Sequence, residues 1–311
     1  MKYADFLGLG ALPSRLEAEF SGGMSVNAYL FVGPSGTGKM QMATICARAL
    51  NCAGAQKPCD ACPPCLRGLA GTHPDVITIE PDGKKSGVGV DEIRELIGRV
   101  MIKPFEGGMH AVIIRDADQM TSGAQNALLK TLESGPESCV FFLLATSAAR
   151  LLSTILSRCR IVRFHAIDEA LCAQVLEARE IEPIRAALLS RAAMGCVGKA
   201  LALHEDEEYW PLRSRVIEAL EALSSSSGGM SVALGLLKDE KDRAGDVLEI
   251  VESIGRELML TAEGGKPSEA LRRIKIDGAT LLGAALSAKE RAASNVVWIN
   301  VIEHLFLQVG R

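Results

Sequence analysis

Residues 28–40 read AYLFVGPSGTGKM, a short apolar run (Ala28–Val32) followed by a glycine-rich stretch. The apolar run predicts a buried strand. A glycine-rich loop between a strand and a helix is the arrangement in which backbone N–H groups surround a phosphate. We therefore expect a phosphate-binding loop, with a chance glycine-rich turn as the alternative; its residues are Gly33, Pro34, Ser35, Gly36, Thr37, Gly38, Lys39 and Met40. Lys39 would reach the β- and γ-phosphates.

Two positions of this predicted nucleotide site depart from a working ATPase. The loop pattern requires Ser or Thr at position 40, because the hydroxyl binds Mg²⁺, but the residue is Met. A thioether is a soft ligand and a poor partner for Mg²⁺. After the apolar run at 111–114, Asp116 stands where a metal-binding Asp belongs, whereas Ala117 replaces the Glu that would polarise water. Strand alternation predicts that Asp118 points elsewhere. We expect a domain that has lost ATP hydrolysis.

The first half of the chain alternates apolar runs with helical patterns. Besides Ala28–Val32, the expected strands are Val76–Glu80, Ala111–Arg115, Val140–Ala145 and Ile161–Phe164, and the expected helices are Lys39–Leu50, Asp91–Val100, Gly123–Leu132 and Leu151–Ser157. This alternation predicts an α/β domain with a mostly parallel sheet. From about Ala166 onward only helices are predicted, three of them short and within Ile167–Leu203. The sequence thus predicts an α/β part followed by an all-α part.

The last predicted helix, Ser294–Leu307, carries Val297, Val301 and Leu305 on one face. This apolar face is expected to belong to the core, with a contact to another subunit as the alternative.

Composition limits the class of protein. The 311 residues are 48% hydrophobic and 23% charged, with a net charge of −4. The balance argues against a chain that binds nucleic acid independently through bulk charge. The N-terminal segment lacks the apolar core of a signal peptide, and no apolar run reaches the length of a membrane span. We expect a cytoplasmic protein without disulfides.

Four of the nine cysteines are closely spaced. Cys52, Cys59, Cys62 and Cys65 offer four thiolates within a short loop that also contains Pro58, Pro63 and Pro64. Zn²⁺ favours a tetrahedron of four such ligands, and a site with four protein ligands is structural. Free thiols and an iron–sulfur cluster are the alternatives.

Arg158 lies in the tripeptide Ser157-Arg158-Cys159, at the end of a predicted helix. An arginine there is commonly a partner for the helix dipole or for surface groups. It can also be an arginine finger, which reaches the nucleotide site of a neighbouring subunit and stabilises charge on the transferring phosphate. The spacing leaves both roles open.

The order of these motifs resembles one family, the bacterial DNA polymerase III clamp-loader subunits, which are AAA+ proteins. The resemblance covers about Ala28–Phe164 strongly and the remainder by layout only. Besides the loop and the cysteines, it is carried by Gly71–Asp75 (GTHPD), Gly89–Asp91 (GVD), Asn126–Glu133 (NALLKTLE) and Ser157–Cys159 (SRC). It implies a RecA-like AAA+ domain over residues 1–165 that includes the zinc module (52–65), a helical lid over 166–207, and a C-terminal helical collar domain that oligomerises over 208–311.

The resemblance also implies roles for single residues. Arg158 matches the arginine that enters the ATP site of an adjacent motor subunit, and the four cysteines match the zinc ligands. Thr146 matches the sensor that reads a γ-phosphate in active members; capping of the strand end is its structural alternative. Gly198-Lys199 stands where a second sensor arginine is expected. Ser134-Gly135 replaces the usual acidic-Pro pair, and the loop before Arg158 is one residue short.

Within this family, the motor subunit (gamma/tau) keeps the loop Thr and an Asp-Glu pair, whereas a second subunit type has a degraded nucleotide site and retains the SRC arginine. Met40 and Ala117 place the chain with the second type. The resemblance then implies a DNA replication protein of the DNA polymerase III holoenzyme with no independent ATPase activity. It would serve in the loading of the sliding clamp onto primed DNA. An ATP-hydrolysing gamma-like subunit is the alternative, and a zinc-binding interaction module with a relic loop is another.

The partners implied are gamma/tau and delta in a pentameric hetero-oligomeric ring, with the sliding clamp and primer–template DNA bound by the complex. The cofactors implied are a structural Zn²⁺ and, at the degenerate loop, ATP or ADP held weakly or not at all.

Overall fold

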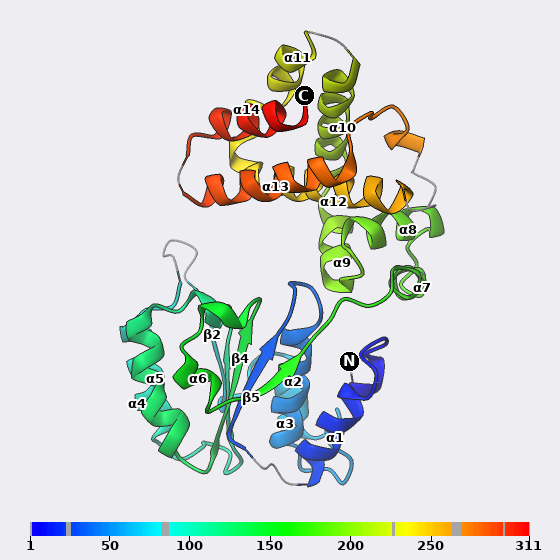
Figure 1. Cartoon of the computed structure of the whole chain (residues 1–311). Helices are drawn as coiled ribbons and strands as arrows, with labels where there is room; N and C mark the ends of the chain where they lie inside the picture. The colour runs from blue at the N-terminus through cyan, green and yellow to red at the C-terminus, as the bar shows by residue number, and fades with distance from the viewer. Residues whose placement is uncertain are drawn as a thin grey trace. The chain divides into compact units, whose positions relative to one another are not determined.

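The computed structural model describes residues 2–22, 26–81, 87–225, 228–262, 269–294 and 296–310. The chain divides into two compact units, Met1–Val175 with Gly195–Lys199, and Leu176–Met194 with Ala200–Arg311. The first contains a sheet and the second is helical (Figure 1). The predicted succession of an α/β part and an all-α part is therefore confirmed, while the three-part division with boundaries at 165 and 207 stays a prediction.

The first unit is built on a five-stranded parallel sheet in the order β2-β3-β4-β1-β5. The strands are β1 (Ala28–Val32), β2 (Val76–Ile79), β3 (His110–Ile114), β4 (Cys139–Ala145) and β5 (Arg160–Arg163). All five lie where the sequence predicts them, with ends shifted by no more than one residue. β1 pairs with β4 (Ala28 opposite Phe141) and with β5 (Tyr29 opposite Arg160). The glycine-rich loop thus leaves an interior strand.

Both faces of the sheet are covered, because apolar residues occupy both side-chain directions of the central strands. Leu30 and Phe141 pack on the face that meets Leu128 of α5. Phe31 and Phe142 pack on the opposite face, with their ring centroids 5.7 Å apart. In Figure 1, α4 and α5 lie on one side of the sheet and α1, α2 and α3 lie on the other.

The helices of this unit agree with the predictions at their centres. The α-helices up to β5 are α1 (Leu12–Gly22), α2 (Lys39–Leu50), α3 (Pro63–Leu69), α4 (Val90–Val100), α5 (Ser122–Ser134) and α6 (Ser153–Leu156). Short 3-10 turns are η1 (Tyr3–Asp5), η2 (Ala117–Gln119) and η3 (Ala148–Arg150). The predicted helix Leu151–Ser157 is thus shorter than expected, and a separate turn precedes it.

Three short helices follow β5, as predicted: α7 (Glu169–Glu177), α8 (Pro183–Ala192) and α9 (Val197–Glu205). The remaining elements are α10 (Tyr209–Ser225), α11 (Gly229–Leu237), η4 (Lys241–Arg243), α12 (Ala244–Ala262), η5 (Glu269–Leu271), α13 (Gly278–Ala293) and α14 (Trp298–Val309).

The last helix belongs to the core of the second unit. Val301 and Leu305 are buried, and Trp298 Nε1 donates a hydrogen bond of 2.8 Å to the carbonyl oxygen of Leu237. Val297 was expected on the same apolar face but is exposed, because the helix begins only at Trp298, four residues later than the predicted Ser294, and Val297 is its N-cap.

Among the described helices, none is by itself long and apolar enough to cross a membrane, although the bent pair α8 and α9 passes that test on length and composition alone.

Candidate functional site

The glycine-rich loop has the predicted strand–loop–helix setting. It leaves β1 at Val32 and enters α2 at Lys39, with Gly38 in the left-handed region (φ +89°). Lys39 Nζ donates hydrogen bonds to the carbonyl oxygens of Gly33 (2.6 Å) and Pro34 (2.7 Å). Burial lowers the pKa of the Lys39 ammonium, against an opposing effect of the nearby Asp118 carboxylate. The lysine is therefore bonded to the loop itself.

The chain's own backbone covers the loop. The N–H of Gly198, at the start of α9, donates a hydrogen bond of 2.8 Å to the carbonyl oxygen of Gly36. A Cβ at Gly36 would lie 2.4 Å from the backbone nitrogen of Lys199, and one at Gly38 would lie 2.6 Å from the Phe6 ring. Such close approaches require glycine. The loop glycines thus serve packing as well as turn geometry.

The two departures found in the sequence are apolar in the structure as well. The Met40 side chain packs against the core on the α2 side of the sheet. Ala117 is fully buried in the core on the other side. Neither position offers an oxygen ligand for a metal or a base for water. The residues present therefore do not fit a hydrolysable Mg²⁺–nucleotide complex.

Asp118 differs from the sequence expectation. Strand alternation does not reach it, because β3 ends at Ile114 and Asp116 adopts a left-handed conformation (φ +47°). Asp118 is buried, and its Oδ2 accepts hydrogen bonds from the Thr146 hydroxyl (2.6 Å) and from the N–H groups of Thr146 and Ser147 (both 3.2 Å). Sequence reasoning missed this role. The sequence signal that was available for this role is the acid itself, which stands four residues after the end of β3 and two residues after Asp116.

This arrangement uses the hydroxyl proton of Thr146. Because Thr146 donates to Asp118, its proton is not presented to a phosphate in this conformation. Thr146 lies where β4 ends, next to Ala145, whose carbonyl oxygen accepts a hydrogen bond from the N–H of Gly33. The sheet thus brings the end of β4 next to the loop, and Asp118 accepts the hydroxyl proton of Thr146. The role of Thr146 as a phosphate sensor stays a prediction.

Arg158 follows α6, on the side of the sheet opposite α2. Its Nη2 donates to Glu133 Oε2 (3.0 Å), and its Nη1 donates to the carbonyl oxygen of Thr154 (3.1 Å) and to Ser157 Oγ (3.4 Å). The contact with Thr154 is a helix-end contact. The side chain nevertheless keeps 30% of its surface exposed. Within the described part of the chain, its contacts come from α5 and α6 and none from the loop.

The four clustered cysteines meet in space. Their sulfur atoms lie within 4.8 Å of one another, and those of Cys52 and Cys62 are 4.0 Å apart. A tetrahedron with Zn–S bonds of about 2.3 Å has S···S edges of about 3.8 Å, so the group matches a zinc site. The N–H groups of Ala61 and Cys62 lower the pKa of the Cys59 thiol to about 6, whereas burial raises that of Cys65 to about 12. A bound cation favours the thiolate at every position.

The cysteine loop is fixed to the end of α2. Arg48 is buried there and forms an ion pair with Asp60, which lies between Cys59 and Cys62. A Cβ on Gly68 of α3 would lie 2.6 Å from the Arg48 side chain. The module is therefore bound to the same helix that begins at the glycine-rich loop.

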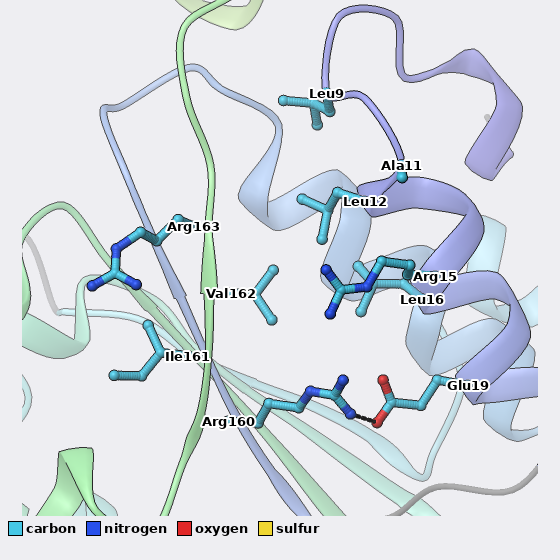
Figure 2. Close-up of a pocket in the computed structure, with 10 residues that line it drawn as sticks. All are labelled: Leu9, Ala11, Leu12, Arg15, Leu16, Glu19, Arg160, Ile161, Val162 and Arg163. Carbon is cyan, nitrogen blue, oxygen red and sulfur yellow. Dashed lines mark hydrogen bonds and ion pairs between the residues drawn. The ribbon is translucent and has the colours of Figure 1, made fainter.

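A separate groove lies between α1 and β5 (Figure 2) and has a volume of about 380 Å³. Arg160 donates a hydrogen bond of 2.6 Å to Glu19 Oε1, which also accepts one from the Tyr29 hydroxyl (2.6 Å). Leu12 and Val162 point into the groove from its two sides. None of the nucleotide, zinc or SRC residues lines it. The Arg160–Glu19 pair joins α1 to the edge strand.

Comparison with known proteins gives a consistent picture. A family model described as DNA polymerase III, delta subunit, matches residues 10–168. The chain is 29% identical over 303 residues to DNA polymerase III subunit delta' of Bacillus subtilis, covering 91% of this chain and 90% of that protein. It is 35% identical over 231 residues to subunit delta' of Escherichia coli, covering 73% of this chain and 68% of that protein.

A protein named subunit tau is similar over a shorter part of its own length. The chain is 34% identical over 230 residues to DNA polymerase III subunit tau of Bacillus subtilis, covering 73% of this chain but 36% of tau. A gamma subunit-related protein of Thermotoga maritima has a solved structure that covers 98% of this chain, with all of its own chain matched, at 17% identity and a TM-score of 0.47.

The cysteine cluster predicts a zinc content that depends on each thiolate. We expect about one equivalent of zinc in the purified protein and a large loss of it in Cys59→Ser, because three thiolates do not complete the tetrahedron. Mass-spectrometric metal analysis measures this. Cys159→Ala, outside the cluster, is the control and retains the metal. Full zinc content in Cys59→Ser would contradict a four-thiolate site.

The Asp118 carboxylate predicts a stability effect. Asp118→Ala removes the acceptor of three hydrogen bonds, and we expect the free energy of unfolding to fall by about 2 kcal/mol. Asp118→Asn keeps one oxygen acceptor and should lose less. Urea denaturation of the zinc-loaded protein compares the two. Equal losses would show that the acceptor oxygen is not what stabilises the turn.

Proposed function

The chain belongs to the DNA polymerase III clamp-loader family, and we propose that it acts there as a subunit of the delta-prime type, which does not turn over ATP itself. In this role it donates Arg158 to the nucleotide site of a neighbouring gamma/tau subunit. Hydrolysis at that site accompanies the loading of the sliding clamp onto primed DNA.

One observation carries the proposal. The chain presents a half-buried guanidinium at Arg158, held in place and partly exposed, while its own nucleotide loop has no hydroxyl at position 40 and no acid at position 117. This combination is what a subunit that donates an arginine finger and does not hydrolyse ATP itself would show. A guanidinium fork stabilises the negative charge that develops on a transferring phosphate, and the neighbouring subunit would supply both metal and nucleotide.

The state of the loop supports the absence of turnover. Lys39 is bonded to loop carbonyl oxygens, and the Thr146 hydroxyl is bonded to Asp118. Phosphate binding would have to replace these contacts. If ATP or ADP enters, the backbone N–H groups of Ser35–Lys39 would surround its phosphates, since Pro34 has no N–H and that of Gly33 donates to Ala145. Without a metal-binding hydroxyl and a base for water, we expect such binding to be weak and without hydrolysis.

Membership of the family supports a proposal for the assembly. We propose gamma/tau and delta as direct partners in a pentameric, cytoplasmic complex, with the clamp and primer–template DNA bound by the whole. The three-part division of the chain, with a lid over 166–207 and a collar over 208–311, is part of this proposal. The four cysteines would hold a structural zinc ion that stabilises the loop on α2.

A second candidate function, an ATP-hydrolysing gamma-like subunit, is favoured by the 34% identity to tau. The two differ in the activity of the isolated chain. We expect no ATP turnover above background with Mg²⁺, because positions 40 and 117 lack the groups that bind metal and activate water. Phosphate release measured at saturating ATP tests this. Turnover that is lost in Lys39→Ala would favour the gamma-like function.

The proposed arginine finger is tested in a complex reconstituted with cognate gamma/tau and delta, whose ATPase rate is measured with clamp and DNA present. We expect Arg158→Ala to lower this rate by tenfold or more, which corresponds to an activation barrier higher by about 1.4 kcal/mol or more. The Arg158→Ala variant should fold normally by itself and should assemble normally with gamma/tau and delta. Arg163→Ala is the matched control, because Arg163 is an exposed arginine of β5 that forms no ion pair within the described residues. A full rate in assembled Arg158→Ala complexes would make Arg158 a helix-end residue only.

A further inference from the structure

Glu133 is the last residue but one of α5 and the acid of the NALLKTLE motif. Its carboxylate lies 3.0 Å from the Arg158 guanidinium. We infer that Glu133 is a positioning residue, which holds Arg158 in the orientation that reaches the neighbouring nucleotide. This inference rests on the proposed arginine-finger function.

The helix that carries Glu133 is fixed against the segment that carries Arg158. Gln125 of α5 is buried, and its Nε2 donates to the carbonyl oxygen of Arg150 (3.2 Å) while its Oε1 accepts from the N–H of Leu152 (2.8 Å). Leu132, the neighbour of Glu133, is buried in the core between α5 and the sheet. Glu133 therefore stands on a rigid support, so its carboxylate can define a position for Arg158.

The contacts of the guanidinium are shared between two elements. Both N–H groups of Nη1 are used, one by the carbonyl oxygen of Thr154 in α6 and one by Oγ of Ser157, the C-cap of α6. Glu133 takes one N–H of Nη2, and the buried Nε has no partner among the described residues. Arginine has five donors, so one N–H of Nη2 is left for an incoming phosphate. The Nη1 contacts alone would let the guanidinium of Arg158 rotate. The hydrogen bond from Nη2 to Glu133 restricts that rotation.

This arrangement reduces the conformational entropy that Arg158 would lose on meeting a phosphate, because its rotamers are already restricted. The effect should be modest, since Glu133 keeps 63% of its surface exposed and exposed ion pairs are weak. No second acid can substitute within the turn, as Ser134 and Gly135 follow. Glu137, in the loop before β4, is exposed and forms no ion pair in the described chain, which makes it a matched control.

The test uses the reconstituted complex with gamma/tau, delta, clamp and primed DNA. We expect Glu133→Ala to lower kcat about threefold to fivefold, within the range of an exposed ion pair, with KM for ATP and the affinity of assembly unchanged. Glu133→Gln keeps an oxygen that accepts the same N–H and should recover part of the rate. Glu137→Ala should match the wild type. A merely structural role of Glu133 would instead change assembly or thermal stability.

The double variant Glu133→Ala/Arg158→Ala separates the two proposals. If Glu133 acts through Arg158, the double variant has the rate of Arg158→Ala alone. If Arg158→Ala is slow but Glu133→Ala is as fast as the wild type, or faster, the positioning role is overturned and the finger stands. A rate of the double variant below that of Arg158→Ala alone also overturns the positioning role. If Arg158→Ala has the full rate, the proposed function itself fails.

Discussion

The position of β1 inside a parallel sheet is the constraint on which the other features of this unit depend. Because β1 pairs with β4 on one side and β5 on the other, the ends of three neighbouring strands meet at one edge. Parallel strands place their carboxyl ends together, where ligand sites of such sheets form. The glycine-rich loop leaves β1 there, and Thr146 follows β4. Phe31 and Phe142, packed against each other, hold β1 and β4 in this register.

At that edge the structure has the expected strand–loop–helix, but two side chains differ from those that a nucleotide-hydrolysing site requires. Where a working site has oxygen ligands, this chain places the apolar side chains of Met40 and Ala117, which pack into the core on opposite faces of the sheet. The polar groups that remain bond to one another: Lys39 to loop carbonyl oxygens and Thr146 to Asp118. Asp118 is the buried member of these groups, and a buried carboxylate needs hydrogen-bond partners, which Thr146 and Ser147 supply.

The cysteine loop (residues 52–65) and the SRC segment (residues 157–159) are attached to elements on opposite faces of the sheet, through different kinds of contact. The cysteine loop is attached through the buried Arg48–Asp60 pair to α2. Arg158 is attached through exposed and half-buried contacts to α5 and α6. Breaking a buried ion pair leaves an unpaired charge and is costly, whereas an exposed pair is weak. The first contact therefore suits a permanent support, and the second suits a side chain that exchanges partners.

The amino-acid sequence by itself determined the features whose partners are close along the chain: the strand–loop–helix at 28–40, the five strands, the group of four closely spaced cysteines, and the apolar residues Met40 and Ala117. Each depends on local backbone preference or on residue type alone. Only the tertiary structure decided the partners of Asp118 and Arg158. Thr146 lies 28 residues from Asp118 in the sequence, and Glu133 lies 25 residues from Arg158. The left-handed turn at Asp116 and the register of parallel strands bring these groups together, and neither follows from hydrophobic pattern.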